Sequence, residues 1–259
     1  MGVDVSYETG VAIVCIDNPP VNAMSEAVLS SLHDVVAGIS SRRDIRVVVF
    51  SGASKAAFLS GADLTELPLL LADPELLGRR MSDVGSLYQL IADLPQVTIA
   101  AVGASAMGGG LELLLVCDFV VASERAKFGL PEVSIGLMPG AGGTQRLFQR
   151  IPSHHAREML LLGAPIGAEQ ALRLGLISRM CPREEVEEQS LEMARQLAGL
   201  PAIAVQSIKR AIAAAVSSQP LDVGLDVERE EFLRVANSAD AQTGPAAFLE
   251  RRKPVFEHK

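Results

Sequence analysis

Residues 104–118 read ASAMGGGLELLLVCD, and this stretch places one carboxylate in unusual company. Glu112 lies just after the glycine run 108–110 and is followed by the apolar run Leu-Leu-Leu-Val. A glutamate that faces solvent rarely has such neighbours, and a buried one is costly unless its charge is used or satisfied. Two interpretations follow: a functional carboxylate, or a glutamate at a helix edge that pairs with a partner.

The glycines of this stretch predict a helix start that can bind an anion. The first N–H groups of a helix have no partner within it, and the helix dipole places partial positive charge there. Glycine lets a ligand approach that backbone closely, which suits an oxygen atom that develops negative charge. Glu112 would share a helix face with Gly108, Gly109, Leu115 and Val116. Desolvation on this apolar face should raise the pKa of Glu112 toward a range useful for acid–base chemistry.

Two further segments carry groups of the same kind. Glu132 lies within FGLPEVSIGLMPGAGG (residues 128–143), ahead of a second glycine loop, and a turn or helix-start glutamate is the alternative interpretation. FLSGADL (residues 58–64) follows a buried strand, and its small residues leave backbone N–H groups open. Two backbone donors and two carboxylates would form a site for enolate chemistry, in which a carbonyl oxygen is held while a proton moves at the adjacent carbon. Spacing alone leaves open whether these segments meet.

The chain alternates between strand and helix patterns and then becomes helical. Apolar and β-branched runs predict strands at 3–7, 11–16, 46–51, 97–103 and 118–123. Helical spacing predicts a helix capped by Ser25, a second over 77–94 that ends at Pro95, and later helices at 156–162, 168–174, 184–197, 203–216 and 221–236. This order predicts an α/β core with a helical C-terminal region and a boundary near residue 200.

Composition and charge limit the classes of function. The 259 residues are 49% apolar and 21% charged, which supports a large core. The net charge of -8 argues against a general nucleic-acid or membrane-surface binder, because these need a basic field. Cys15, Cys117 and Cys181 lack CxxC spacing and are expected to be buried free thiols in a reducing compartment. With no signal-like start and no apolar run of ~18 residues, we expect a cytoplasmic protein.

Motifs for other chemistries match poorly. PGAGGTQR (residues 139–146) lacks the Lys-Ser/Thr pair of a P-loop and has Gln145 where GxGxxG has its third glycine. GASAM (residues 103–107) places Ser105 like a nucleophile elbow but lacks the closing glycine. His154 and His155 are interpreted as helix-start residues that face solvent, so no Ser-His-Asp triad and no metal site are expected.

Several motifs together resemble the crotonase superfamily, and within it the enoyl-CoA hydratases. The matching segments occur in order and with similar spacing, nearly end to end: NPPVNAM, AFLSGADL, GASAMGGGLELLLVCD, KFGLPEVSIGLMPGAGGTQRL and AAFLERRKPVF. The resemblance implies an α/β fold, the crotonase (ClpP-like) spiral of repeated ββα units, with a helical C-terminal region. It also implies a spiral core over residues 1–200 and a helical region over 201–259 that covers the pocket and joins subunits.

The resemblance implies a role for each matched position. The backbone N–H groups of Ala62 and Gly109 would form an oxyanion hole for the thioester oxygen. Glu112 would activate water for attack at C3, Glu132 would supply the proton to C2, and the Gly140 N–H would help to seat the water. The acyl-CoA would lie against a set of matched positions: Val21, Ser60, Gly61, Leu64, Phe248 and Arg251.

One position departs from the family pattern. Thr65 stands where many relatives place a lysine near the CoA phosphates, so Lys55 or Arg251 would have to supply part of the positive charge. Coenzyme A would enter as part of the substrate, and no separate cofactor is expected. The family resemblance further implies a homotrimer or homohexamer. No nucleic-acid or membrane partner is expected, because the net charge is acidic.

Other functions remain compatible with the same fold. The family includes double-bond isomerases, decarboxylases, methylglutaconyl-CoA hydratases and enzymes that act on carrier-protein thioesters. Isomerases commonly use one catalytic carboxylate, whereas this chain has both Glu112 and Glu132, which favours hydration. A non-catalytic relative that binds a partner such as RNA is a further alternative, with Arg251, Arg252 and Lys253 as a local basic patch.

Overall fold

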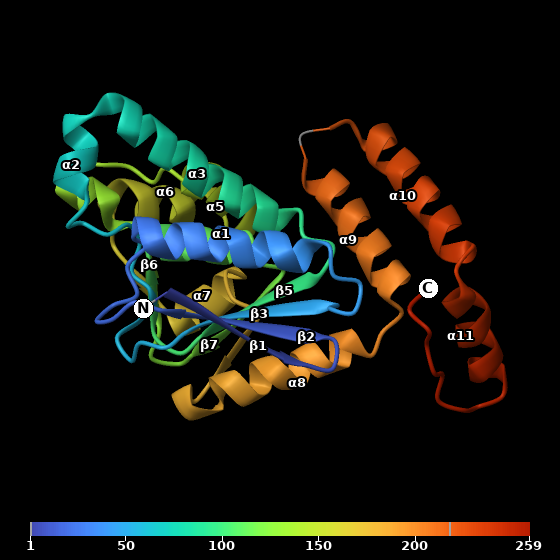
Figure 1. Ribbon diagram of the computed structural model, residues 1–259. Coiled ribbons are helices and arrows are strands. Elements are labelled where there is room, and N and C mark those ends of the chain that lie inside the picture. The colour runs from blue at the N-terminus through green and yellow to red at the C-terminus, as the bar shows by residue number, and fades with distance from the viewer. Residues whose placement is uncertain (1, 218) are drawn as a thin grey trace.

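A computed structural model describes residues 2–217 and 219–259. Its larger sheet has the strand order β1-β2-β3-β5-β7-β10 (Figure 1). The bounds of these strands are β1 Gly2–Glu8, β2 Val11–Asp17, β3 Val47–Gly52, β5 Val97–Val102, β7 Phe119–Ser123 and β10 Arg179–Cys181. The hairpin β1–β2 is antiparallel, and every later pairing in this sheet is parallel.

A smaller sheet has the order β4-β6-β8-β9 and positions the candidate site. Its strands are short: β4 Ala57–Leu59, β6 Ser105–Met107, β8 Lys127–Gly129 and β9 Ile166–Gly167. The pairings of β4 with β6 and of β6 with β8 are parallel. Because parallel strands end at the same edge of a sheet, the loops that follow β4, β6 and β8 lie side by side.

The two sheets are linked by a repeated turn of the chain. Each turn enters the larger sheet, passes to the smaller sheet and returns through helices, as in β3–β4–α2–α3, β5–β6–α4 and β7–β8–η1–α5–α6. These helices are α2 Leu67–Ala72, α3 Pro74–Ala92, α4 Gly109–Leu115, η1 Pro131–Ile135, α5 Gly143–Arg150 and α6 Ser153–Leu162. The repetition is the spiral of ββα units that the sequence resemblance implied.

Helices cover both faces of the larger sheet (Figure 1). Strand β3 is buried on both faces, with Val48 and Phe50 in one apolar cluster and Val47 and Val49 in the other. The first cluster contains apolar side chains of α1 (Glu26–Ser40), α3 and α4, and the second contains those of α8 (Val186–Ala198). As predicted, Ser25 caps α1, and its side chain accepts a hydrogen bond from the Val28 N–H.

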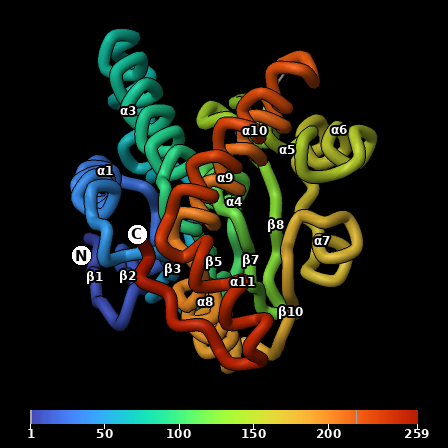
Figure 2. Tube along the Cα trace, turned by 90° about the vertical axis from the view of Figure 1, so that its right-hand side faces the viewer, coloured from blue at the N-terminus to red at the C-terminus, as the bar shows by residue number. Residues whose placement is uncertain are grey.

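The C-terminal helices extend beyond this core (Figures 1 and 2). Helices α9 Ala202–Val216 and α10 Leu221–Ala236 pack against each other, and α11 Ala239–Leu249 follows. Lys209 of α9 is anchored to the core, because its Nζ lies 2.6 Å from Asp118 Oδ2 and donates to the Gln96 carbonyl oxygen. Large apolar side chains on these helices are exposed, including Ile208, Phe232 and Phe248.

The structure differs from the sequence predictions mainly in its short elements. The helix predicted over 77–94 is α3, which begins at Pro74 after the cap Asp73 and ends at Ala92. The strands β4, β6, β8 and β9 were not predicted, because two or three residues are too short for a periodic pattern. Helices α5 and α11 were also missed, since glycines precede the first and Pro245 lies inside the second. Helix α7 (Ala168–Leu174) matches its predicted range.

The described residues include no single helix that is long and apolar enough to cross a membrane. The segments Arg183–Ala198 and Ala202–Val216 pass such a test only when they are joined, and they are bent by 106° relative to each other.

Gly110 is the position where the fold least tolerates a side chain. A Cβ added there would lie 2.0 Å from the Leu59 carbonyl oxygen, because α4 starts directly against β4. We expect Gly110→Ala to lower the free energy of unfolding by about 3 kcal/mol, the upper end of the usual cost of over-packing. Urea denaturation measures this change. Gly38→Ala is the matched control, because a Cβ at that exposed helix position meets nothing within 4 Å; it should be neutral or stabilise by up to about 1 kcal/mol. Equal stability of the two variants would contradict this prediction.

Candidate active site

The loops after β4, β6 and β8 meet around the start of α4. A Cβ added at Gly61 would lie 3.2 Å from the Gly109 nitrogen, and one added at Gly108 would lie 2.9 Å from Glu132 Oε1. Gly61 and Gly108 have φ angles of 96° and 53°, which favour glycine. The three segments that the sequence singled out are therefore adjacent, and only glycine permits an approach this close.

Two backbone N–H groups at this meeting point are free. Met24 N–H donates to the Gly61 carbonyl, and Asp63 N–H donates to the Met24 carbonyl, so the N–H of Ala62 between them points away from Met24. The Gly109 N–H is the first of α4 and has no partner within the helix. Neither N–H has an acceptor in residues 2–217 and 219–259. Both N–H groups are therefore open to an acceptor that comes from outside the described chain.

Glu112 is buried beside this pair, with only 3% of its surface exposed. Its Oε1 accepts hydrogen bonds from the Ala141 N–H and the Gly143 N–H, both at 2.8 Å. Burial raises the pKa of Glu112 above its usual value, although the two N–H donors and the positive charge of Arg146 partly offset that effect. Oε2 has no protein donor among the described residues and is left for a ligand or water.

Glu132 supplies a second carboxyl group from η1. It is half-buried, and its Oε2 is shielded from solvent without a hydrogen-bond partner among the described residues. Burial raises the pKa of Glu132, and the negative charge of Glu112 raises it further, while a backbone hydrogen bond acts in the opposite direction. The two carboxyl groups therefore lie close enough to affect each other electrostatically, and protonation of Glu132 is favoured relative to an exposed glutamate.

Comparison with known proteins gives consistent matches over nearly the whole chain. The family described as Enoyl-CoA hydratase/isomerase matches residues 6–259. The 2,3-dehydroadipyl-CoA hydratase of Escherichia coli is 35% identical over 254 residues, which are 98% of this chain and 97% of that protein. The crystal structure of an enoyl-CoA hydratase from Bacillus anthracis superposes with a TM-score of 0.95 at 34% identity and covers 99% of both chains. The chain belongs to the enoyl-CoA hydratase/isomerase family.

A further relative in this family is the short-chain-enoyl-CoA hydratase of Clostridium acetobutylicum. It is 32% identical over 248 residues, which are 95% of this chain and 94% of that protein. The solved relative also establishes the fold class, since the α/β architecture with two sheets and C-terminal helices is shared at that TM-score.

The predicted positions for the CoA part of a family substrate fall into two groups. Val21, Ser60 and Leu64 lie on the loops next to Gly61, and the Ser60 N–H donates to the Asn22 carbonyl, which joins the loop containing Val21 to the one containing Ser60. Phe248 and Arg251 lie instead at the end of α11, on the C-terminal extension, where Phe248 is 82% exposed. No hydrogen bond in the described chain joins either of them to the loops around Glu112.

The departing residue Thr65 and the predicted site residue Gly140 are both placed by their local contacts. Thr65 donates its hydroxyl to Asp63 Oδ1 at 2.7 Å, which fixes the loop that carries the Ala62 N–H. Gly140 lies under the Met81 side chain of α3, because a Cβ added at Gly140 would be 2.1 Å from Met81 Cε. An apolar side chain therefore covers the loop next to Glu112.

Sequence reasoning missed the groups that hold the site together. Tyr88 is fully buried and donates its hydroxyl to the Gly109 carbonyl oxygen at 2.7 Å. Asn22 is also fully buried, and its Nδ2 donates to the carbonyl oxygens of Ala57 and Phe58, which fixes β4 relative to the preceding loop. Asn22, the second asparagine of NPPVNAM, was a visible signal for its contact with β4. A single tyrosine in a helix gives no signal of the contact that Tyr88 makes.

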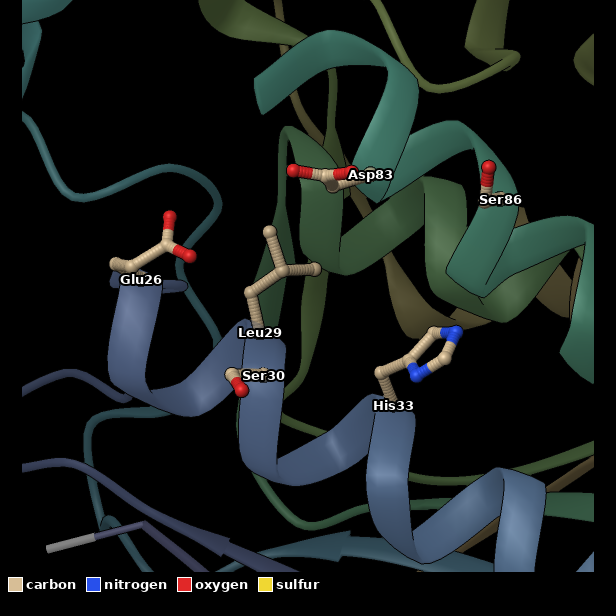
Figure 3. Close-up of a pocket in the computed structure, with 6 residues that line it drawn as sticks. All are labelled: Glu26, Leu29, Ser30, His33, Asp83 and Ser86. Carbon is tan, nitrogen blue, oxygen red and sulfur yellow. The ribbon is translucent and has the colours of Figure 1, made fainter. Parts of the chain in front are cut away.

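A separate surface groove lies between α1 and α3 (Figure 3). Its lining residues are Glu26, Leu29, Ser30, His33, Asp83 and Ser86. None of the predicted site residues lines this groove, so it is distinct from the meeting point of the three loops.

Proposed function

We propose that this protein is an enoyl-CoA hydratase that adds water across the 2,3 double bond of an unsaturated acyl-CoA. The observation that carries the proposal is the pair of carboxyl groups, Glu112 and Glu132, beside the free N–H groups of Ala62 and Gly109. A conjugated thioester becomes an enolate when water attacks C3, so two donors aimed at the thioester oxygen stabilise the transition state directly. Removing one such donor in other enzymes costs about 10²–10³ in rate.

Each carboxyl group has a separate role in this mechanism. Glu112 is ionised and removes a proton from water through its open Oε2 while the water oxygen bonds to C3. The electron pair of the double bond moves to the thioester oxygen, where the N–H groups of Ala62 and Gly109 hold it. Glu132 is protonated and delivers its proton to C2 as the enolate collapses. Transfer of the proton from Glu112 to Glu132 restores the starting state, and the sum of the steps is addition of one water molecule.

Loss of the enone absorbance of crotonyl-CoA tests this proposal. We expect rapid loss with the purified protein and a 3-hydroxyacyl-CoA as the product, identified by mass spectrometry. No reaction with crotonyl-CoA would direct the assay to branched and carrier-bound thioesters, and no reaction with any unsaturated thioester would overturn the hydratase proposal. A shifted double bond in place of a hydroxyl group would identify an isomerase instead.

The side chains near the site favour a neutral acyl group. Leu64 and Met138 are exposed beside the loops that carry Ala62 and Gly140, and Met81 covers Gly140. The arginines nearby are already engaged: Arg146 with Ala141 and Gln89, and Arg80 with Glu26 and Glu66.

We therefore expect kcat/KM for crotonyl-CoA to exceed that for 2,3-dehydroadipyl-CoA by about tenfold or more. The free carboxylate at the end of the dehydroadipyl group would lose its water in the site without gaining a cation as partner. Steady-state kinetics with both thioesters measure the ratio. A preference for dehydroadipyl-CoA would contradict this prediction and would indicate the substrate for which the Escherichia coli relative is named.

The exposed apolar side chains of α9–α11, such as Ile212 and Phe232, support a homo-oligomer, which we infer to be a trimer or hexamer. Sedimentation velocity tests this, and a monomer at micromolar concentration would contradict it. A cytoplasmic location stays a prediction, since relatives with mitochondrial names occur beside bacterial ones.

A further inference from the structure

Arg146 contacts the loop 141–143, whose N–H groups donate to Glu112. Arg146 Nη1 donates to the Ala141 carbonyl oxygen at 2.9 Å. A Cβ added at Gly142 would lie 2.1 Å from the same Nη1, so the guanidinium group packs directly against the Gly142 backbone, whose φ angle is 107°. Ala141 is therefore fixed on both sides, with its N–H on Glu112 and its carbonyl oxygen on Arg146.

A second helix braces this arginine. Arg146 Nη2 donates to Gln89 Oε1 of α3 at 3.1 Å, and Gln89 Nε2 donates in turn to Asp93 Oδ1 at 2.9 Å. The preceding residue of α3, Tyr88, donates to the Gly109 carbonyl oxygen. Adjacent residues of one helix thus hold the two halves of the site, the Glu112 loop through Arg146 and the start of α4 through Tyr88.

Arg146 also supplies the positive charge that faces Glu112. The ionisable groups around this carboxylate are Arg146 from α5, Glu132 from η1 and Tyr88 from α3. Burial raises the pKa of Tyr88 well above its usual value, so the phenol is neutral, and Glu132 cannot stabilise a second negative charge. Arg146 is the one group of this set that favours the ionised form of Glu112, and its charge lowers the pKa of Glu112 against the effect of burial.

We propose that Arg146 is a positioning residue for the catalytic carboxylate: it fixes the loop 141–143 on Glu112, faces Glu112 with its positive charge, and is braced from α3 by Gln89. It acts through the loop and not by contact with substrate. The effect of Arg146 on catalysis rests on the proposed function, whereas its effect on the position and pKa of Glu112 does not. A conservative lysine would keep the charge but lose the paired contacts to Ala141 and Gln89.

Two variants separate the charge of Arg146 from its contacts. In Arg146→Gln, the carboxyl carbon signal of Glu112 in NMR, assigned with Glu112→Gln, should titrate at higher pH than in the wild type. Hydration should slow by about 10²-fold in kcat, with KM little changed, since misplacement of a catalytic group by about 1 Å costs that much. In Arg146→Lys the Glu112 titration should stay close to that of the wild type, while kcat remains reduced. If Arg146→Gln does not fold, Arg146→Lys and Gln89→Met still test the bracing contacts through kcat.

Arg150→Gln is the matched control. Arg150 lies one turn further along α5 and donates to the Cys117 carbonyl oxygen, so it makes an arginine-to-backbone contact away from Glu112. This variant should lower the thermal midpoint without moving the Glu112 titration. An unmoved Glu112 titration in Arg146→Gln, or an equal shift in Arg150→Gln, would overturn the inference. If no thioester is hydrated by the wild type but the titration moves as expected, the proposed function fails while the assignment of Arg146 to Glu112 holds.

Discussion

Glu112→Gln should lower kcat for enoyl-CoA hydration by about 10²–10⁴-fold, the usual contribution of a general base. Glutamine has the same shape, and its amide oxygen can still accept the N–H groups of Ala141 and Gly143. Those two donors hold the amide oxygen inward, so the amide nitrogen takes the place of Oε2, where the carboxylate would meet water. The fold is kept and only the base is lost. Initial rates of enone loss with crotonyl-CoA measure the effect.

The control for this variant is Glu169→Gln. Glu169 is an exposed residue of α7 that pairs with Arg173, away from the loops of the site. Its replacement should leave kcat unchanged. If Glu112→Gln kept more than about a tenth of the wild-type kcat, Glu112 would not be the base, and the assignment of the site would fail.

Glu132→Gln should also lower kcat by about 10²–10⁴-fold, because an amide cannot deliver a proton to C2. The same variant should raise the thermal midpoint at neutral pH. The carboxyl group of Glu132 has a shielded, unpartnered Oε2 and lies near the negative charge of Glu112, so its ionised form is unfavourable in the folded state. Activity assays and thermal melts over a pH series measure the two effects.

The direction of the pH effect follows from the raised pKa of Glu132. Between its unfolded and folded pKa values, the folded protein binds more protons at this residue than the unfolded protein does, so stability falls as pH rises through that window. Above the window the loss is complete. Glu132→Gln does not titrate, so its gain in thermal midpoint should grow as pH rises through this window and should disappear below the ordinary glutamate range. A gain that persists at low pH, or a loss at neutral pH, would contradict this account.

The sequence was sufficient for the larger elements and for the start of α4 beside Glu112. Apolar runs predicted β2, β3, β5 and β7, and glycines next to Glu112 predicted a helix start with open N–H groups. These features are local, because strand and helix periodicity depends on residues close together in sequence. The roles assigned to Glu112, Glu132, Ala62, Gly109 and Gly140 stay predictions, and the structure adds that the segments carrying them are adjacent.

What the sequence could not provide is the convergence of distant segments. The strands β4, β6 and β8 are each three residues long, too short for a periodic signal, yet their parallel pairing brings residues 61, 108 and 132 together. The contacts of Tyr88 and Arg146 are likewise invisible in sequence, because each depends on how α3 and α5 pack over the site. Helix α5 was missed because its first residues belong to the glycine-rich segment PGAGGTQR, which was compared only with phosphate-binding motifs.

The C-terminal helices show a different limit. Phe248 and Arg251 match positions that reach CoA in the family, but they lie on an extension beyond the core. Their role, and the division into a core over 1–200 and a helical region over 201–259, stay predictions. The exposed apolar surface of α9–α11 is consistent with contacts that a single chain does not make.

The most direct test of the central claim uses water labelled with heavy oxygen. The protein is incubated with crotonyl-CoA in labelled water, and the product is analysed by mass spectrometry. The account predicts one labelled oxygen atom on C3 of a 3-hydroxyacyl-CoA, at a rate that Glu112→Gln and Glu132→Gln both reduce by about 10² or more. An unlabelled product with a moved double bond, or release of free coenzyme A by cleavage of the thioester, would contradict it.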